Sequence, residues 1–205
     1  MTSSMQRKPK FLEPRYGGKS AFVQHQAMKI RLYAGKFRRW QNVDLEAVDR
    51  FIFICKGNIS RSPYSEARSL QLGHPAISFG TEAQDGKPAE SSAYRNALAR
   101  GLDLSAHRAT SMASFAPGKN DLVLCYEPIH ALFIENVATA TVDIEHMPQV
   151  SLLGLWSSAP RPLIFDPYSL HDQYYQTCYT VIDSALATLT ALTASATVPE
   201  ATGHE

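Results

Sequence analysis

Residues 50–72 constrain the fold of this chain more than any other segment. They begin with the apolar, β-prone run FIFI at positions 51–54 and end in a stretch of good helix formers that opens at Pro63. A continuous apolar run is typical of a strand buried on both faces of a parallel sheet, and proline is tolerated in the first turn of a helix. The segment therefore predicts a buried strand, a loop and a helix, in that order.

The loop between this strand and helix, residues 55–62, reads CKGNISRS. Gly57 and Asn58 are residue types that adopt the positive φ angles of a tight turn. Successive N–H groups in such a turn, together with those at the start of a helix, form a positive concavity that suits a tetrahedral oxyanion. Surroundings of this kind can lower the pKa of a cysteine from about 8.5 to roughly 3.5–7.5, so we expect a thiolate at neutral pH. Arg61 adds a planar fork that can bind two phosphoryl oxygens.

The string CKGNISRSP resembles the signature of the low-molecular-weight protein tyrosine phosphatase family, C-x5-R-S/T-P with Gly-Asn inside the loop. The resemblance covers roughly residues 50–192. It implies hydrolysis of phosphate esters through a cysteinyl-phosphate, with Cys55 as nucleophile and Arg61 as phosphate clamp. The residues that it implies for phosphate binding are Lys56, Gly57, Asn58, Ile59, Ser60, Arg61 and Ser62.

Two further segments match the family pattern. The segment FDPY at residues 165–168 resembles the family's general-acid loop, in which Asp166 would protonate the leaving oxygen and Tyr168 would wall the pocket. The segment GLDLSAHRAT at residues 101–110 resembles one in which a histidine, here His107, lies near the phosphate loop and bonds Asn58. A surface or helix-capping role for that histidine stays open. The resemblance implies no cofactor and no metal, and the sequence has no cluster with ligand spacing.

The sequence departs from the family pattern at two places. Many members carry a second cysteine where this chain has Ser60, so a protective disulfide within the loop is unavailable and Cys55 should be prone to irreversible oxidation. The loop after the second strand commonly holds an aromatic residue, but residues 82–87 contain none. The choice between phosphotyrosine and other small aryl esters therefore stays open.

Apolar strand patterns alternate with helical patterns along the rest of the chain. This alternation predicts right-handed crossovers and an α/β three-layer sandwich, with a central parallel sheet of four strands in the order 2-1-3-4 and helices on both faces. In the helix expected from residue 127 to 138, we predict that Ile129, Leu132, Phe133 and Ile134 face the core. The other expected strands are 76–81, 121–125 and 150–153, and the other expected helices are 91–100 and 172–192.

Composition bounds the class and the compartment. A chain of 205 residues with 44% hydrophobic content can build one sizeable core without disulfides. Three scattered cysteines favour a reducing compartment, and no apolar run approaches the roughly 20 residues of a membrane span. We therefore expect a cytoplasmic protein without a transmembrane segment or a nucleic-acid partner.

The near-zero net charge conceals a basic N-terminal extension. Residues 1–48 contain ten Lys and Arg against three Asp and Glu, a net charge of +7, whereas the remainder, with ten basic and sixteen acidic residues, carries −6. We place a boundary there, with a catalytic domain at 49–195 and a flexible tail at 196–205. An amphipathic helix is expected in the extension. It could pack on the acidic domain or fray in solvent. Alternatively, it could dock on an anionic partner or membrane surface, or serve as a targeting segment. Its expected apolar face is Val23, Ala27, Ile30, Ala34 and Phe37.

Two other functions compete with phosphatase activity. A thiol-dependent arsenate reductase would need two further cysteines near the third strand, where only Cys125 lies. A catalytically idle phosphate-binding module is the alternative from another class, but the presence of Cys55, Arg61 and Asp166 together favours an enzyme. The expected partner is a phosphotyrosyl protein, for which a tyrosine kinase is a precedent within the family.

Overall fold

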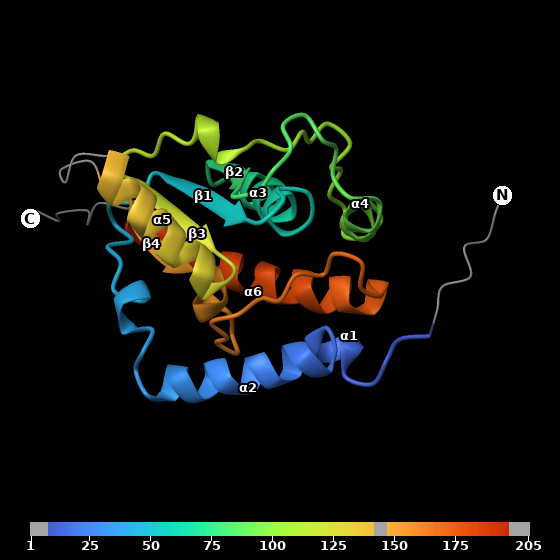
Figure 1. Ribbon diagram of the computed structural model, residues 1–205. Helices are drawn as coiled ribbons and strands as arrows, with labels where there is room; N and C mark the ends of the chain where they lie inside the picture. Colours follow the sequence, from blue (N-terminus) through green and yellow to red (C-terminus); the bar gives the residue numbers. More distant parts are fainter. Residues whose placement is uncertain (1–7, 142–146, 197–205) are drawn as a thin grey trace, which may run out of the picture.

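Four parallel strands form the central sheet of the computed structural model, which describes residues 8–141 and 147–196 (Figure 1). The strands are β1 (Arg50–Cys55), β2 (Ala76–Gly80), β3 (Asp121–Cys125) and β4 (Gln149–Leu152). Their order across the sheet is β2-β1-β3-β4, and each neighbouring pair is parallel. The predicted α/β class, the four strands and their order are therefore confirmed.

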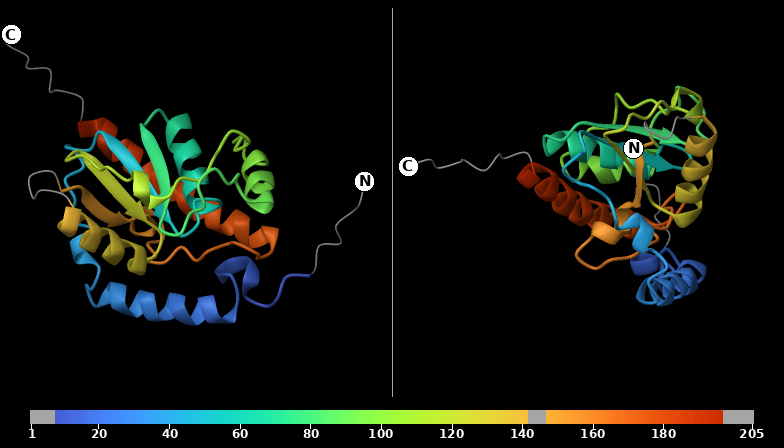
Figure 2. Two further views of the ribbon diagram at one scale, coloured as in Figure 1. Left: turned by 45° about the horizontal axis from the view of Figure 1, so that its top comes forward. Right: turned by 90° about the vertical axis from the view of Figure 1, so that its left-hand side faces the viewer.

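The pleat of β1 builds two cores, one on each face of the sheet. Phe51 and Phe53 pack on one face with α3, α4 and α6, whereas Ile52 and Ile54 pack on the other face with α5. Figure 2 shows these helices covering both faces, so the predicted three layers are present. The helices are α3 (Arg61–Gln71), α4 (Ser91–Leu98), α5 (Pro128–Thr141) and α6 (Asp172–Ala196), with the 3-10 turns η2 (Met112–Ser114) and η4 (Leu153–Trp156).

The buried face predicted for α5 is wrong. Ile129, Leu132 and Phe133 are exposed, and of the predicted inward residues only Ile134 is buried, together with Ala131. Apolar residues lie on all sides of this helix, so its sequence has no clear periodicity that could select a face. Small alanine side chains at the contact let the helix lie close to the sheet.

The N-terminal extension contains α1 (Glu13–Tyr16), α2 (Lys19–Tyr33) and the 3-10 turn η1 (Arg38–Trp40). A helix is present as expected, but its predicted apolar face is wrong, because Val23 and Ile30 are exposed. The side chains that α2 buries are instead those of Ala21 and His25. The helix ends at Tyr33 before the left-handed Gly35, so Phe37 lies beyond it, outside the helical rhythm.

Residues after α2 join the core of the sheet. Phe37 and Trp40 are buried in the same cluster as Ile52 and Ile54. The indole Nε1 of Trp40 donates to Glu135 Oε1 at 2.7 Å, and Arg39 pairs with the other oxygen of that carboxylate at 2.9 Å. The extension thus packs on the acidic part of the chain, while the domain boundary near residue 48 stays a prediction.

The predicted tail lies outside the described residues, apart from residue 196, where α6 ends. None of the helices in the described ranges has the length and apolar character needed to cross a bilayer.

The backbone around Gly154 packs closely against the segment that carries Arg161, and a substitution can test this contact. A Cβ added to Gly154 would lie 2.1 Å from the carbonyl oxygen of Arg161, whose N–H donates to Gly154 O at 2.9 Å. Because two backbone segments touch there, we expect Gly154→Ala to lower the free energy of unfolding by about 3 kcal/mol in urea titrations. Gly118→Ala is the matched control, since its added Cβ meets only Asp121 Oδ2 at 3.7 Å, and it should cost less than about 1 kcal/mol. Equal costs for the two variants would contradict this account.

Candidate active site

The loop at residues 55–62 joins the carboxyl end of β1 to α3, which begins at Arg61, two residues before the predicted start. Of the two residues expected to adopt positive φ, Asn58 does so, at 51°, whereas Gly57 does not. The Asn58 side chain holds this conformation from inside the protein. Its Nδ2 donates to Ser62 Oγ at 2.8 Å and to Ser78 Oγ at 2.7 Å, and its Oδ1 accepts the N–H of Thr110 at 2.8 Å.

The backbone of the loop presents a set of unused donors. Within the described part of the chain, none of the N–H groups of residues 56–62 donates to a protein acceptor. Backbone N–H groups are almost always satisfied in folded proteins, so a run of free ones on a tight turn indicates an anion site. The cradle expected from the sequence is therefore present in the backbone geometry.

Cys55 lies at the floor of this cradle and is almost fully buried. Its Sγ is 3.0 Å from Ser62 Oγ. Because that hydroxyl oxygen already accepts a hydrogen bond from Asn58, its own hydrogen can be directed at the sulfur. The arrangement supplies one hydroxyl donor to a thiolate at this position.

Arg61 is completely buried and is held by three groups from different elements. Its NH1 donates to Glu127 Oε1 and to the carbonyl oxygen of Ile164, both at 2.7 Å, and its NH2 donates to Asp166 Oδ2 at 2.9 Å. Burial alone would lower the pKa of Arg61, but the negative charges of Asp166, Glu127 and Cys55 raise it, so the side chain stays charged. Its Nε is a buried donor without an acceptor in the part of the chain that the structure describes.

Glu127 is a site residue that the sequence analysis missed. It follows the carboxyl end of β3 by two positions, which is the edge of a parallel sheet where ligands bind. That position is the one available signal, since a single glutamate after a strand has no distinctive pattern. Its contact with Arg61 fixes the guanidinium from the side opposite Asp166.

Asp166 lies on the loop before α6, and the structure places its carboxyl against Arg61 as the prediction requires. Its Oδ1 accepts the N–H of Tyr168 at 3.1 Å, while the Tyr168 ring is half exposed at the pocket mouth. His107 lies within 2.7 Å of the Asn58 carbonyl oxygen through its Nε2. Because burial lowers the pKa of His107, the ring is neutral at pH 7 and donates from Nε2, and this bond supports the left-handed Asn58.

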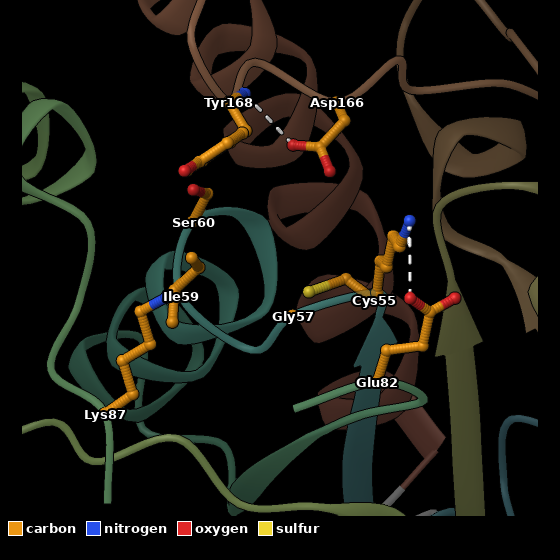
Figure 3. A pocket seen from close by; sticks show the side chains of 9 residues that line it. Cys55, Gly57, Ile59, Ser60, Glu82, Lys87, Asp166 and Tyr168 are labelled. Atoms are coloured by element: carbon orange, nitrogen blue, oxygen red, sulfur yellow. Dashed lines mark hydrogen bonds and ion pairs between the residues drawn. The ribbon is translucent and has the colours of Figure 1, made fainter. Parts of the chain in front are cut away.

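Most of the predicted site residues line one cavity of about 210 Å³, namely Cys55, Lys56, Gly57, Ile59, Ser60, Asp166 and Tyr168 (Figure 3). The buried Arg61 does not line it, nor do Asn58, Ser62 and His107. Cys55 lies at its floor, with Ile59 and Ser60 on the loop side and Asp166 with Tyr168 opposite. The hydroxyl of Ser60 is buried and has no partner among the described residues. Glu82 and Lys87 also line the cavity and were not predicted as site residues; both come from the loop after β2 that lacks an aromatic residue.

Comparison with known proteins identifies the family. The sequence model of the low molecular weight phosphotyrosine protein phosphatases matches residues 50–199. This chain belongs to that family. It is 31% identical to the low molecular weight protein-tyrosine-phosphatase Wzb of Salmonella typhimurium over 138 residues, which cover 66% of this chain and 87% of that one.

Solved structures agree with this assignment. The tyrosine phosphatase Wzb from Escherichia coli K30 in complex with sulphate superposes with a TM-score of 0.57 at 28% identity, covering 71% of this chain and 98% of that chain. The YwlE arginine phosphatase from Geobacillus stearothermophilus has the same fold, with a TM-score of 0.62 at 20% identity, covering 76% of this chain and 99% of that one. The phosphatase therefore has the fold and the cysteine-dependent hydrolytic chemistry of its family.

The helix α1 supports the loop that carries Asp166. Glu13 is buried, and its Oε1 accepts the N–H of His171 at 3.1 Å. The carbonyl oxygen of Pro14 accepts from Thr177 Oγ1 on α6 at 2.6 Å. Gly17 lies so close that an added Cβ would be 2.9 Å from the Phe165 ring. Residues of the extension thus contact the segment on both sides of Asp166.

We expect Glu13→Gln to lower kcat for aryl phosphates by about tenfold, because a loosened loop misplaces Asp166 while the binding loop is untouched. KM should change less than kcat, and both are measured by steady-state kinetics. Glu46→Gln removes a carboxylate from an exposed part of the extension and should leave both parameters unchanged. A parallel rise in KM, or no change in kcat, would show that α1 does not position the loop.

Proposed function

We propose that this phosphatase hydrolyses phosphotyrosyl residues of proteins and small aryl phosphate monoesters, with Cys55, Arg61 and Asp166 as its catalytic residues. The observation that carries the proposal is the run of N–H groups at residues 56–62, directly after Cys55, none of which donates to an acceptor within residues 8–141 and 147–196. Such preorganised donors stabilise the charge that develops on phosphoryl oxygens in the transition state. The sulphate in the related Wzb structure is a tetrahedral anion of the same shape as phosphate.

The reaction has two steps in this proposal. On substrate binding the proton of the Cys55 thiol passes to Asp166, which leaves Arg61 as a carboxylic acid. The Cys55 thiolate then attacks phosphorus, the S–P bond forms, and the P–O bond to the leaving group breaks while Asp166 gives that oxygen the proton. Water then attacks the cysteinyl-phosphate and transfers a proton to Asp166, and the S–P bond breaks to release inorganic phosphate. The hydroxyl of Ser62 stabilises the departing thiolate at 3.0 Å.

Substrate binding rearranges the ion pair between Arg61 and Asp166. Nε of Arg61 has no acceptor among residues 8–141 and 147–196, and NH2 is bonded only to Asp166. When Asp166 turns toward the leaving oxygen, these two neighbouring donors can bind two phosphoryl oxygens as a fork. Glu127 and Ile164 meanwhile keep NH1 in place.

The pocket walls favour an aryl ester of a protein. Ile59 and the Tyr168 ring offer apolar surface on opposite sides of the opening. Glu82 and Lys87 give the remaining wall charged groups that can contact a polypeptide around the phosphotyrosine. A tyrosine kinase is one candidate for that phosphoprotein, and an acidic partner of the basic extension is another proposed contact.

An arsenate reductase on the same fold has less support. Cys125 and Cys178 are free but completely buried, and burial raises the pKa of both thiols, that of Cys178 to about 12. Neither can readily relay electrons as a thiolate. A reduced Cys55 without a neighbouring cysteine to protect it agrees with a cytoplasmic location, which we propose.

Removal of the nucleophile tests the mechanism directly. Cys55→Ser should lower kcat for p-nitrophenyl phosphate by roughly three orders of magnitude or more, because a serine hydroxyl is not ionised at neutral pH. Cys178→Ala, which removes a buried thiol from α6, should keep kcat within about threefold. Added EDTA should not lower the activity, since Arg61 and the loop amides supply the positive charge. Residual turnover in Cys55→Ser near the unmodified rate would exclude this mechanism.

Substitution of the acid should depend on the leaving group. Asp166→Asn should lower kcat for phenyl phosphate by about 10²- to 10⁴-fold and affect p-nitrophenyl phosphate less, because nitrophenolate leaves without a proton. Asp103→Asn changes an exposed acid away from the pocket and should leave both rates unchanged. An equal loss for both esters would mean that Asp166 holds Arg61 but does not transfer a proton.

A further inference from the structure

A second cavity, of about 270 Å³, lies between the N-terminal extension and the segment that follows η4. We call it the α2 pocket, and it is lined among others by Arg15, Tyr16, His25, Lys29, Tyr33 and Arg161. It shares no lining residue with the catalytic cavity. Figure 1 shows α2 running along the outside of the molecule beside this segment.

Three cations converge on the α2 pocket without neutralising partners. Arg15 comes from α1, Lys29 from α2 and Arg161 from the segment before Asp166. No acidic side chain lines the pocket, and across the described ranges none of the three makes an ion pair. Three unpaired positive charges around one concavity repel one another, and a bound anion would remove that repulsion.

Contacts within the protein fix parts of the pocket wall. The N–H of Arg161 donates to Gly154 O at 2.9 Å, which fixes the backbone of this residue against η4. The Tyr16 ring packs edge-on against Phe22 and His25, with ring centroids 4.9 and 5.6 Å away. The guanidinium of Arg15 lies over the same Tyr16 ring, 5.3 Å from its centroid. These contacts fix the backbone of Arg161 and the Tyr16 ring against which Arg15 lies.

His25 reports the positive field of the pocket. Burial, together with the positive charges of Arg161 and Lys29, lowers the pKa of His25 to about 4. The ring is thus neutral at pH 7 and lies between two cations. An anion bound among them would favour the imidazolium and raise this pKa.

We propose that the α2 pocket binds a phosphate monoester dianion without hydrolysing it. Two guanidinium forks and an ammonium group suit the oxygens of a doubly charged phosphate better than a single carboxylate. The volume exceeds that of the catalytic cavity, so a group of the same size fits. The Tyr16 and Tyr33 rings can contact an aryl group on the ester, as in a second phosphotyrosine of a substrate protein. Among the described residues none of those that line the pocket is a cysteine or a carboxylate, so the thiol and the carboxylic acid of the catalytic cavity have no counterpart there.

The test uses the full-length Cys55→Ser protein, which binds esters without turning them over. Titration with phenyl phosphate should give two sites by calorimetry, and the His25 ring resonances should show its pKa rising by about 1 to 3. His107, beside the phosphate loop, reports the catalytic site separately. Glycerol phosphate is the second probe. Tighter binding of phenyl phosphate at the α2 pocket points to an aryl ester, and equal binding points to a phosphate headgroup; either result supports a phosphate site.

Matched variants assign the second site to its residues. Arg161→Ala should weaken binding at His25 by at least about tenfold and leave the His107 response unchanged. Lys36→Ala removes the same charge from the extension outside the pocket and should affect neither response. Lys29→Gln, at an exposed position, repeats the test if Arg161→Ala fails to fold. A single site by calorimetry, an unmoved His25, or equal effects of Arg161→Ala and Lys36→Ala would overturn the proposal. A failed catalytic assignment would instead alter the His107 response alone.

Discussion

The buried guanidinium of Arg61 is the interaction on which the rest of the site depends. A fully buried charge is stable only when it is paired and hydrogen-bonded, and Arg61 meets this condition through Glu127, Ile164 and Asp166. These partners come from the end of β3 and from the loop before α6. Folding of the sheet and placement of the loop that carries Asp166 are therefore both needed to bury this charge, so the residues that we propose as catalytic assemble together with the core.

The parallel sheet explains why a few short loops are enough to form the anion-binding site. In the register of the sheet Cys55 pairs with Gly80 and Ile54 with Cys125, so all three strands end at one edge. The phosphate loop follows β1, Glu82 and Lys87 follow β2, and Glu127 follows β3. Because helices start or loops turn at that edge, backbone N–H groups can face a ligand there, beside the buried cation Arg61.

Local features of the sequence were predictable, and features set by distant contacts were not. The phosphate loop has its nucleophile and its clamp six positions apart, and continuous apolar runs marked β1 and β3, so these elements followed from short stretches of sequence. The buried faces predicted for α2 and α5 were wrong for two reasons. Apolar residues lie on all sides of α5, and the chain at Gly35 leaves the helical conformation, so Phe37 does not continue the spacing of α2. Glu127 and the support from α1 were missed because a lone glutamate and a four-residue helix have no distinctive pattern.

The N-terminal extension contacts the segment of residues 161–171, which carries Asp166, at two places, and these contacts limit how the extension can influence the site. Arg161 lines the α2 pocket, Phe165 lies against Gly17 directly after α1, and His171 bonds Glu13 of α1. Asp166 therefore lies on a stretch that the extension contacts on both sides. A ligand in the α2 pocket would alter catalysis only if it bound one arrangement of this stretch better than another. The close backbone contact between Gly154 and Arg161 resists such rearrangement at one end. These contacts suit the extension to support the loop that carries Asp166, and in our proposal a ligand in the α2 pocket would add to substrate recognition without changing the chemical step.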